Sequence, residues 1–81
     1  RPKFAKKSLG QNFLVDQNYI QKIISALNLQ PNETIIEIGP GRGALTKHLV
    51  ESGANIIAIE LDRDLVPILQ KEFIDYENFQ I

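Results

Sequence analysis

The chain has 81 residues, no cysteine and a net charge of −1, with 43% hydrophobic and 23% charged residues. The lack of cysteine excludes a disulfide-stapled secreted scaffold, and no apolar run approaches the roughly 20 residues that a transmembrane helix needs. The amino terminus also lacks the apolar core of a signal peptide, so we expect a globular domain in the cytoplasm.

Positive charge is concentrated at the amino terminus. Four basic residues precede the first acidic residue, so this segment carries +4 and the remainder, by subtraction from −1, carries −5. They are Arg1, Lys3, Lys6 and Lys7. Lysines interleaved with Phe4 and Phe13 suit an RNA backbone and unstacked bases, although a solubilising tail is an open alternative. We therefore expect a basic arm at residues 1–15 and a separate domain at residues 16–81.

The first part of the domain predicts a helix and then a strand. Asp16 is a good N-cap, and apolar residues recur at helical spacing on one face up to a stop near Asn28. This face consists of Tyr19, Ile20, Ile23, Ile24 and Leu27. After a turn at Pro31, residues 34–38 form a β-branched run that is typical of a buried parallel strand.

The rest of the chain continues this alternation. A second helix runs from Ala44 to a glycine stop at Gly53, and residues 55–60 are an apolar strand. Asp64 is expected to cap a third helix, and residues 78–81 open a third strand. This order predicts an α/β, Rossmann-like, doubly wound fold with a mostly parallel sheet. An open parallel sheet normally has more strands than this chain can supply. We therefore expect the chain to be the amino-terminal portion of the fold, truncated at the start of the third strand.

A glycine-rich loop, Gly39-Pro40-Gly41-Arg42-Gly43, follows the first strand. Glycines let the backbone approach a ligand, and Glu60, after the next strand, is placed to bind the ribose hydroxyls of an adenosine. The loop also fits the dinucleotide fingerprint, but Pro40 lacks an N–H that a pyrophosphate would use. S-adenosyl-L-methionine has no phosphate and suits the same residues, and Glu37 could meet its ammonium group. A nicotinamide dinucleotide and a ligand-free turn stay open at this point.

Other polar residues predict no further chemistry. His48 is the only histidine, and we interpret it as a solvated helix position. Asp62 and Asp64 are interpreted as capping residues. Because no metal-ligand cluster and no nucleophile–base pair can be assembled, we expect no metal.

Three motifs, in order along the chain, resemble the ribosomal RNA adenine dimethyltransferase family. They are Lys7-Ser8-Leu9-Gly10-Gln11-Asn12-Phe13-Leu14, the loop region at residues 37–46, and Ile59-Glu60-Leu61-Asp62-Arg63-Asp64. The resemblance spans essentially the whole chain. Leu9-Gly10 and Pro40 favour the bacterial housekeeping branch over the macrolide-resistance branch.

The resemblance implies an S-adenosyl-L-methionine-dependent enzyme that dimethylates N6 of two adjacent adenines near the 3′ end of small-subunit rRNA, in the immature subunit. It implies cofactor contacts from the amino-terminal motif, the loop and the acid after the second strand, and RNA contacts from the arm. The cofactor-binding residues would be Asn12, Leu14, Gly39, Gly41 and Glu60, and the RNA-binding residues Lys3, Lys6 and Lys7.

The catalytic motif of that family, Asn-Leu-Pro-aromatic, would lie beyond Ile81, so we assign no catalytic residue in the chain. We expect these residues alone neither to methylate RNA nor to bind the cofactor tightly. Two other classes stay open: an NAD-dependent oxidoreductase, and an RNA-binding or ribosome-assembly module that keeps the fold without the chemistry. The oligomeric state does not follow from the sequence.

Overall fold

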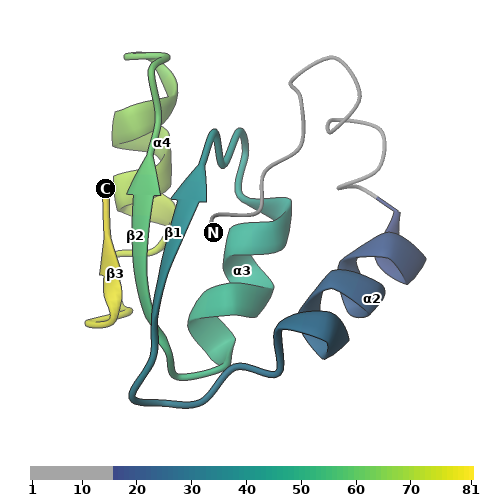
Figure 1. The fold of residues 1–81 in the computed structure, drawn as a ribbon. Helices are drawn as coiled ribbons and strands as arrows, with labels where there is room; N and C mark the ends of the chain where they lie inside the picture. Colours follow the sequence, from purple (N-terminus) through teal and green to yellow (C-terminus); the bar gives the residue numbers. More distant parts are fainter. Residues whose placement is uncertain (1–15) are drawn as a thin grey trace.

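The structure is a computed structural model that describes residues 16–81. In chain order these residues form α2 (Gln17–Leu27), β1 (Thr34–Ile38), α3 (Ala44–Glu51), β2 (Asn55–Ile59), α4 (Leu65–Glu72) and β3 (Phe79–Gln80). The strands make one parallel sheet in the order β1-β2-β3 (Figure 1). The alternation confirms the predicted α/β fold. The arm at residues 1–15 lies outside the described residues, so its separation from the domain stays a prediction.

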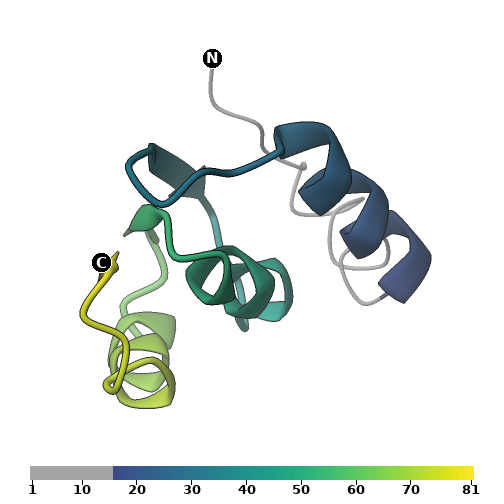
Figure 2. The same cartoon turned by 90° about the horizontal axis from the view of Figure 1, so that it is seen from below.

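The three described helices lie on one face of the sheet (Figure 2). Successive strand residues point to opposite faces, so burial alternates along β1 and β2. On the face away from the helices, three isoleucine side chains are 40% to 48% exposed to solvent. They are Ile36, Ile38 and Ile59. Within the described residues, the sheet therefore has one covered face and one bare face.

The core lies between the sheet and the helices α3 and α4. Its buried residues are Leu49, Val50, Ala54, Ile56, Leu69 and Phe73. The ring of Phe73 also packs against Tyr76 and Phe79, with centroids 6.1 and 5.1 Å away. Asn78 links β3 to the end of α3, because its Nδ2 donates to the carbonyl oxygens of Val50 (2.9 Å) and Ala54 (2.8 Å). Because all three strands are parallel, their carboxyl ends lie at one edge of the domain.

Both ends of α2 match the sequence prediction. Asp16 accepts a hydrogen bond from the N–H of Asn18, and Asn28 ends the helix in the left-handed conformation with φ 47°. Ile20 is fully buried, whereas Tyr19 is 45% exposed and has Lys22 Nζ 5.7 Å from its ring centroid. Consecutive helix residues lie about 100° apart, so Tyr19 sits at the edge of the apolar face. No described helix is long and apolar enough to cross a membrane.

The start of α4 matches the predicted N-cap position, Asp64, but the side chain of this residue makes no capping hydrogen bond. Instead, Asp62 Oδ1 accepts from the N–H of Asp64 at 2.9 Å, and the carbonyl oxygen of Asp62 accepts from the N–H of Leu65 at 3.0 Å. Pro67 is the third residue of α4, where a missing N–H removes no intrahelical bond. Asp64 is therefore the N-cap of α4 by position, as predicted, while Asp62 closes the turn that leads into the helix.

Candidate cofactor-binding site

The glycine loop joins β1 to α3 at the carboxyl end of the sheet (Figure 1). Gly39, Gly41 and Gly43 have φ of 68°, 60° and 87°, a region that residues with side chains rarely adopt. A Cβ added to Gly39 or Gly41 would meet nothing within 4 Å. These two glycines leave open space beside the backbone, where a ligand can approach closely.

Gly43 has a different role, because it allows α4 to pack against the loop. A Cβ at this position would lie 2.9 Å from Phe73 Cε2 and 3.1 Å from Leu69 Cδ2. Contacts this short force neighbouring side chains to shift. The structure therefore separates two glycines that border open space from one that serves packing.

The N–H groups of the loop glycines are engaged within the protein. Gly39 donates to the carbonyl oxygen of Ile59 at 2.8 Å, and Gly43 donates to that of Pro40 at 2.9 Å. Gly41 donates to Glu60 Oε1 at 3.1 Å. A pyrophosphate at such a loop is held by free backbone N–H groups, and Pro40 has none. The hydrogen bonds of the loop therefore favour a ligand without a phosphate.

Glu60 follows β2 directly and lies beside the glycine loop. Its Oε1 accepts from the N–H of Gly41 and its Oε2 accepts from the N–H of Asp62 at 2.9 Å. The side chain is half-buried, and a backbone donor on each oxygen fixes the orientation of the carboxylate. Each oxygen keeps a lone-pair direction for another donor, so the carboxylate can still accept from two neighbouring hydroxyl groups.

Glu37 lies beneath the loop and is only 5% exposed. It points to the helix side of the sheet, where its Oε1 accepts from Thr46 Oγ1 of α3 at 2.5 Å. Burial raises the pKa of Glu37 to about 7, against the opposing effect of the Thr46 hydrogen bond. The sequence analysis did not single out Thr46, whose only signal was a hydroxyl on the helix that follows the loop.

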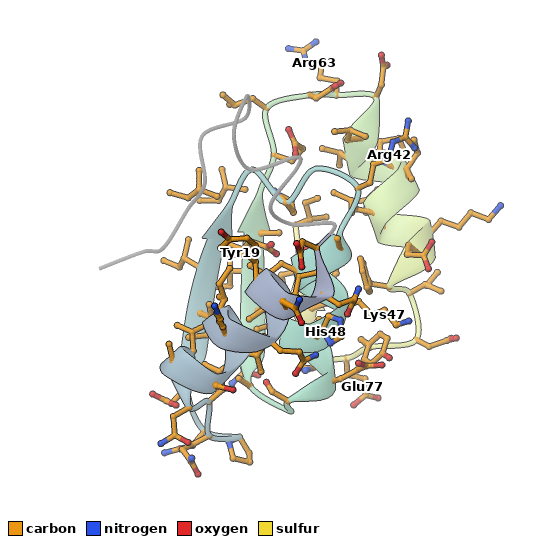
Figure 3. The ribbon with its side chains drawn as sticks, turned by 90° about the vertical axis from the view of Figure 1, so that its right-hand side faces the viewer. Tyr19, Arg42, Lys47, His48, Arg63 and Glu77 are labelled. Atoms are coloured by element: carbon orange, nitrogen blue, oxygen red, sulfur yellow. The ribbon has the colours of Figure 1, made fainter. Side chains whose placement is uncertain are left out.

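Leu61 is a second residue that the sequence analysis quoted only inside a motif. It lies between Glu60 and Asp62 and is 93% exposed. Arg42 and Arg63, on the loops after β1 and β2, extend outward at the same end of the molecule (Figure 3). This end of the molecule therefore combines an exposed apolar side chain with charged groups of both signs.

The remaining predicted residues fall into two groups. Asn12, Leu14, Lys3, Lys6 and Lys7 lie outside the described residues, and their roles stay predictions. His48, in the last turn of α3, is half-buried. Residues 16–81 contain no group of three or more histidine, cysteine, aspartate or glutamate side chains that could hold a metal ion.

A parallel sheet, a glycine loop at the carboxyl ends of its strands and an acid after the second strand define the Rossmann-like class of α/β domains. Within this class, residues 3–81 match the ribosomal RNA adenine dimethylase family, and the chain belongs to that family.

Three curated relatives are each named Ribosomal RNA small subunit methyltransferase A. The chain is 52% identical over 77 residues to the protein of Pseudomonas putida, 51% over 75 residues to that of Clostridium botulinum and 48% over 75 residues to that of Alkaliphilus metalliredigens. The matched regions cover 95%, 93% and 93% of this chain, but 29%, 27% and 26% of the relatives. The chain therefore spans somewhat more than a quarter of their length.

Proposed function

We propose that the chain is the cofactor-binding part of an enzyme that dimethylates N6 of two adjacent adenines near the 3′ end of small-subunit rRNA. Its methyl donor is S-adenosyl-L-methionine, and its substrate is the immature small ribosomal subunit in the cytoplasm. The family and the name that the relatives share support the substrate. The observation that supports the cofactor is the contact between the glycine loop and Glu60, at 3.1 Å.

The described residues fit this cofactor in three places. Gly39 and Gly41 border open space that receives the methionine end. Glu60 holds its carboxylate in a fixed orientation for the ribose hydroxyls, and Leu61, 93% exposed, offers apolar surface to the adenine. When bound, S-adenosyl-L-methionine supplies a methyl group that is activated by a positively charged sulfur.

Charge also suits this cofactor better than a dinucleotide. The chain beyond the basic arm carries −5, and the carboxylate of Glu60 contacts the loop. S-adenosyl-L-methionine carries an ammonium, a sulfonium and one carboxylate and is therefore a net cation, whereas a dinucleotide brings two negatively charged phosphates. An acidic domain attracts the former and repels the latter.

The basic arm supplies the complementary function in this proposal. Its lysines, Lys3, Lys6 and Lys7, contact the RNA backbone, and Asn12 and Leu14 close over the cofactor. A target adenine must leave its stack before its exocyclic nitrogen can align with the methyl–sulfur bond. The residues that orient this nitrogen are assigned outside this chain.

A methyl-transfer assay with the full-length protein tests the proposal. Small ribosomal subunits that lack the modification are incubated with methyl-labelled S-adenosyl-L-methionine, and the rRNA is digested to nucleosides. We expect labelled N6,N6-dimethyladenosine from two adjacent positions near the 3′ end. Binding to the subunits without methylation would instead indicate an assembly module, and tighter binding of NAD than of S-adenosyl-L-methionine would indicate an oxidoreductase.

A further inference from the structure

One buried hydrogen bond spans the glycine loop. Glu37, on β1, precedes the loop, and Thr46, in the first turn of α3, follows it. The two residues are 5% and 0% exposed, and Thr46 Oγ1 donates to Glu37 Oε1 at 2.5 Å across nine positions of sequence. Among the described residues, Thr46 is the only hydrogen-bond partner of the Glu37 side chain.

A polar pair at this position needs an explanation, because apolar residues would serve packing better. The other helix-facing residue of β1 is Ile35, and parallel strands are usually apolar on their buried faces. Replacing a buried polar or charged pair by apolar residues of similar size is often neutral or stabilising. The Glu37–Thr46 pair therefore points to a role in geometry rather than in stability.

The geometry that the pair controls is that of the loop. Glu37–Thr46 joins the segments on the two sides of residues 39–43. Within the loop, the N–H of Gly39 is tied to Ile59 and that of Gly41 to Glu60. A loop that is held before a ligand arrives loses less conformational entropy on binding, and its affinity is higher for that reason.

We propose that Glu37 and Thr46 are positioning residues, which hold residues 39–43 in the conformation that receives the methionine end of the cofactor. The inference rests on the proposed function, since it takes S-adenosyl-L-methionine as the ligand. In this proposal Thr46 does not contact the reacting atoms.

The test replaces Thr46 by valine, which keeps the size of the side chain and removes its hydroxyl. In the full-length protein, calorimetry gives the Kd for S-adenosyl-L-methionine, and methylation of small subunits gives KM for the cofactor and kcat. We expect Thr46→Val to raise Kd and KM about tenfold, as for the loss of one hydrogen bond to a carboxyl group. At saturating cofactor, kcat should stay within about twofold.

Two further variants serve as controls. Thr46→Ser restores the hydroxyl, and we expect its Kd to return to within about threefold of the wild type. Thr34→Val makes the same chemical change at an exposed position at the start of β1, and its Kd should match the wild type.

An unchanged Kd in Thr46→Val would overturn the inference, and so would a lower kcat with unchanged KM, since partial unfolding has that signature. If Thr46→Val does not fold, Thr46→Ala is compared with Thr46→Ser, because these two differ by the hydroxyl alone. Equal affinity in that pair would also contradict the positioning role. A wild-type protein that does not bind S-adenosyl-L-methionine would instead reject the proposed function itself.

Discussion

Glu60 supports the glycine loop and, in the proposed function, is also the acid that binds the ribose. Its two oxygens accept from the N–H groups of Gly41 and Asp62, so its carboxylate is oriented before any cofactor arrives. The sequence placed this acid correctly after the second strand, because the end of an apolar run is easy to recognise. The contact with Gly41 could not be predicted, since it depends on the path of the loop.

Removing the carboxylate of Glu60 should weaken cofactor binding. We expect Glu60→Ala to raise the Kd for S-adenosyl-L-methionine at least tenfold, because hydrogen bonds to a charged group contribute about 1.5–3 kcal/mol. Calorimetry on the full-length protein measures this change. Asp64→Ala is the matched control, since the Asp64 side chain makes no capping hydrogen bond. Equal Kd values for the wild type and Glu60→Ala would show that the ribose role is wrong.

Alanine substitutions at Gly43 and Gly41 should have different effects, the first mainly on the stability of the protein and the second mainly on its affinity for the cofactor. Gly43→Ala brings a Cβ to 2.9 Å from Phe73, and we expect a loss of about 2–4 kcal/mol from this overlap and the positive φ together. Gly41→Ala meets no neighbour, so only about 1–2 kcal/mol of backbone strain is expected, but its methyl group enters the open space of the site.

Urea unfolding and cofactor calorimetry on both full-length variants test this division. Gly43→Ala should show the larger fall in the free energy of unfolding. Gly41→Ala should show a weakened affinity that its modest loss of stability does not explain. The reverse ranking would mean that the two positions have been assigned the wrong roles.

At the scale of elements, local patterns predicted the order of all six helices and strands in residues 16–81. Helix α2 was predicted with its cap at Asp16 and its end near Asn28, because both signals lie in neighbouring residues, whereas the left-handed conformation of Asn28 was not predicted. The N-cap position of Asp64 was predicted, but the missing hydrogen bond of its side chain was not, since that depends on the backbone path of the turn that Asp62 closes. Likewise, the contact of β1 with α3 through Glu37 and Thr46 required the packing of the two elements.

This contact between β1 and α3 should make stability depend on pH. Burial raises the pKa of Glu37 from its ordinary 4.5 to about 7, so between these values the folded state keeps a proton that the unfolded state has released. The free energy of unfolding should therefore fall as pH rises from 4.5 to 7, by about 3 kcal/mol, and the slope that Glu37 contributes should fade as pH passes through 7.

Urea unfolding of the full-length protein at several pH values measures this slope. Glu37→Gln does not titrate, so the wild-type curve should fall relative to the variant curve across the same range. Parallel curves would show that Glu37 does not hold a proton in the folded state.

At the scale of the whole molecule, the described residues leave one face of the sheet bare. Ile36, Ile38 and Ile59 are 40% to 48% exposed on this face, and within residues 16–81 β1 pairs only with β2. Parallel sheets are normally covered on both faces, and the chain spans 26% to 29% of the length of its relatives. We therefore expect segments outside residues 16–81 to cover this face in the full-length protein.

A lysine on this face tests that expectation. Ile36→Lys in the full-length protein should lower the free energy of unfolding by about 2 kcal/mol or more, because it buries a charge without a partner. Gln70→Lys, at an exposed position of α4 and away from this face, should change it by less than about 0.5 kcal/mol. Equally small effects in both variants would show that the face is open to water.

The most direct test of the central claim is a crystal structure of the full-length protein with S-adenosyl-L-methionine bound. The account predicts that both ribose hydroxyls donate to the carboxylate of Glu60, while the methionine end lies against Gly39 and Gly41. A cofactor bound elsewhere, or one whose ribose does not contact Glu60, would contradict it.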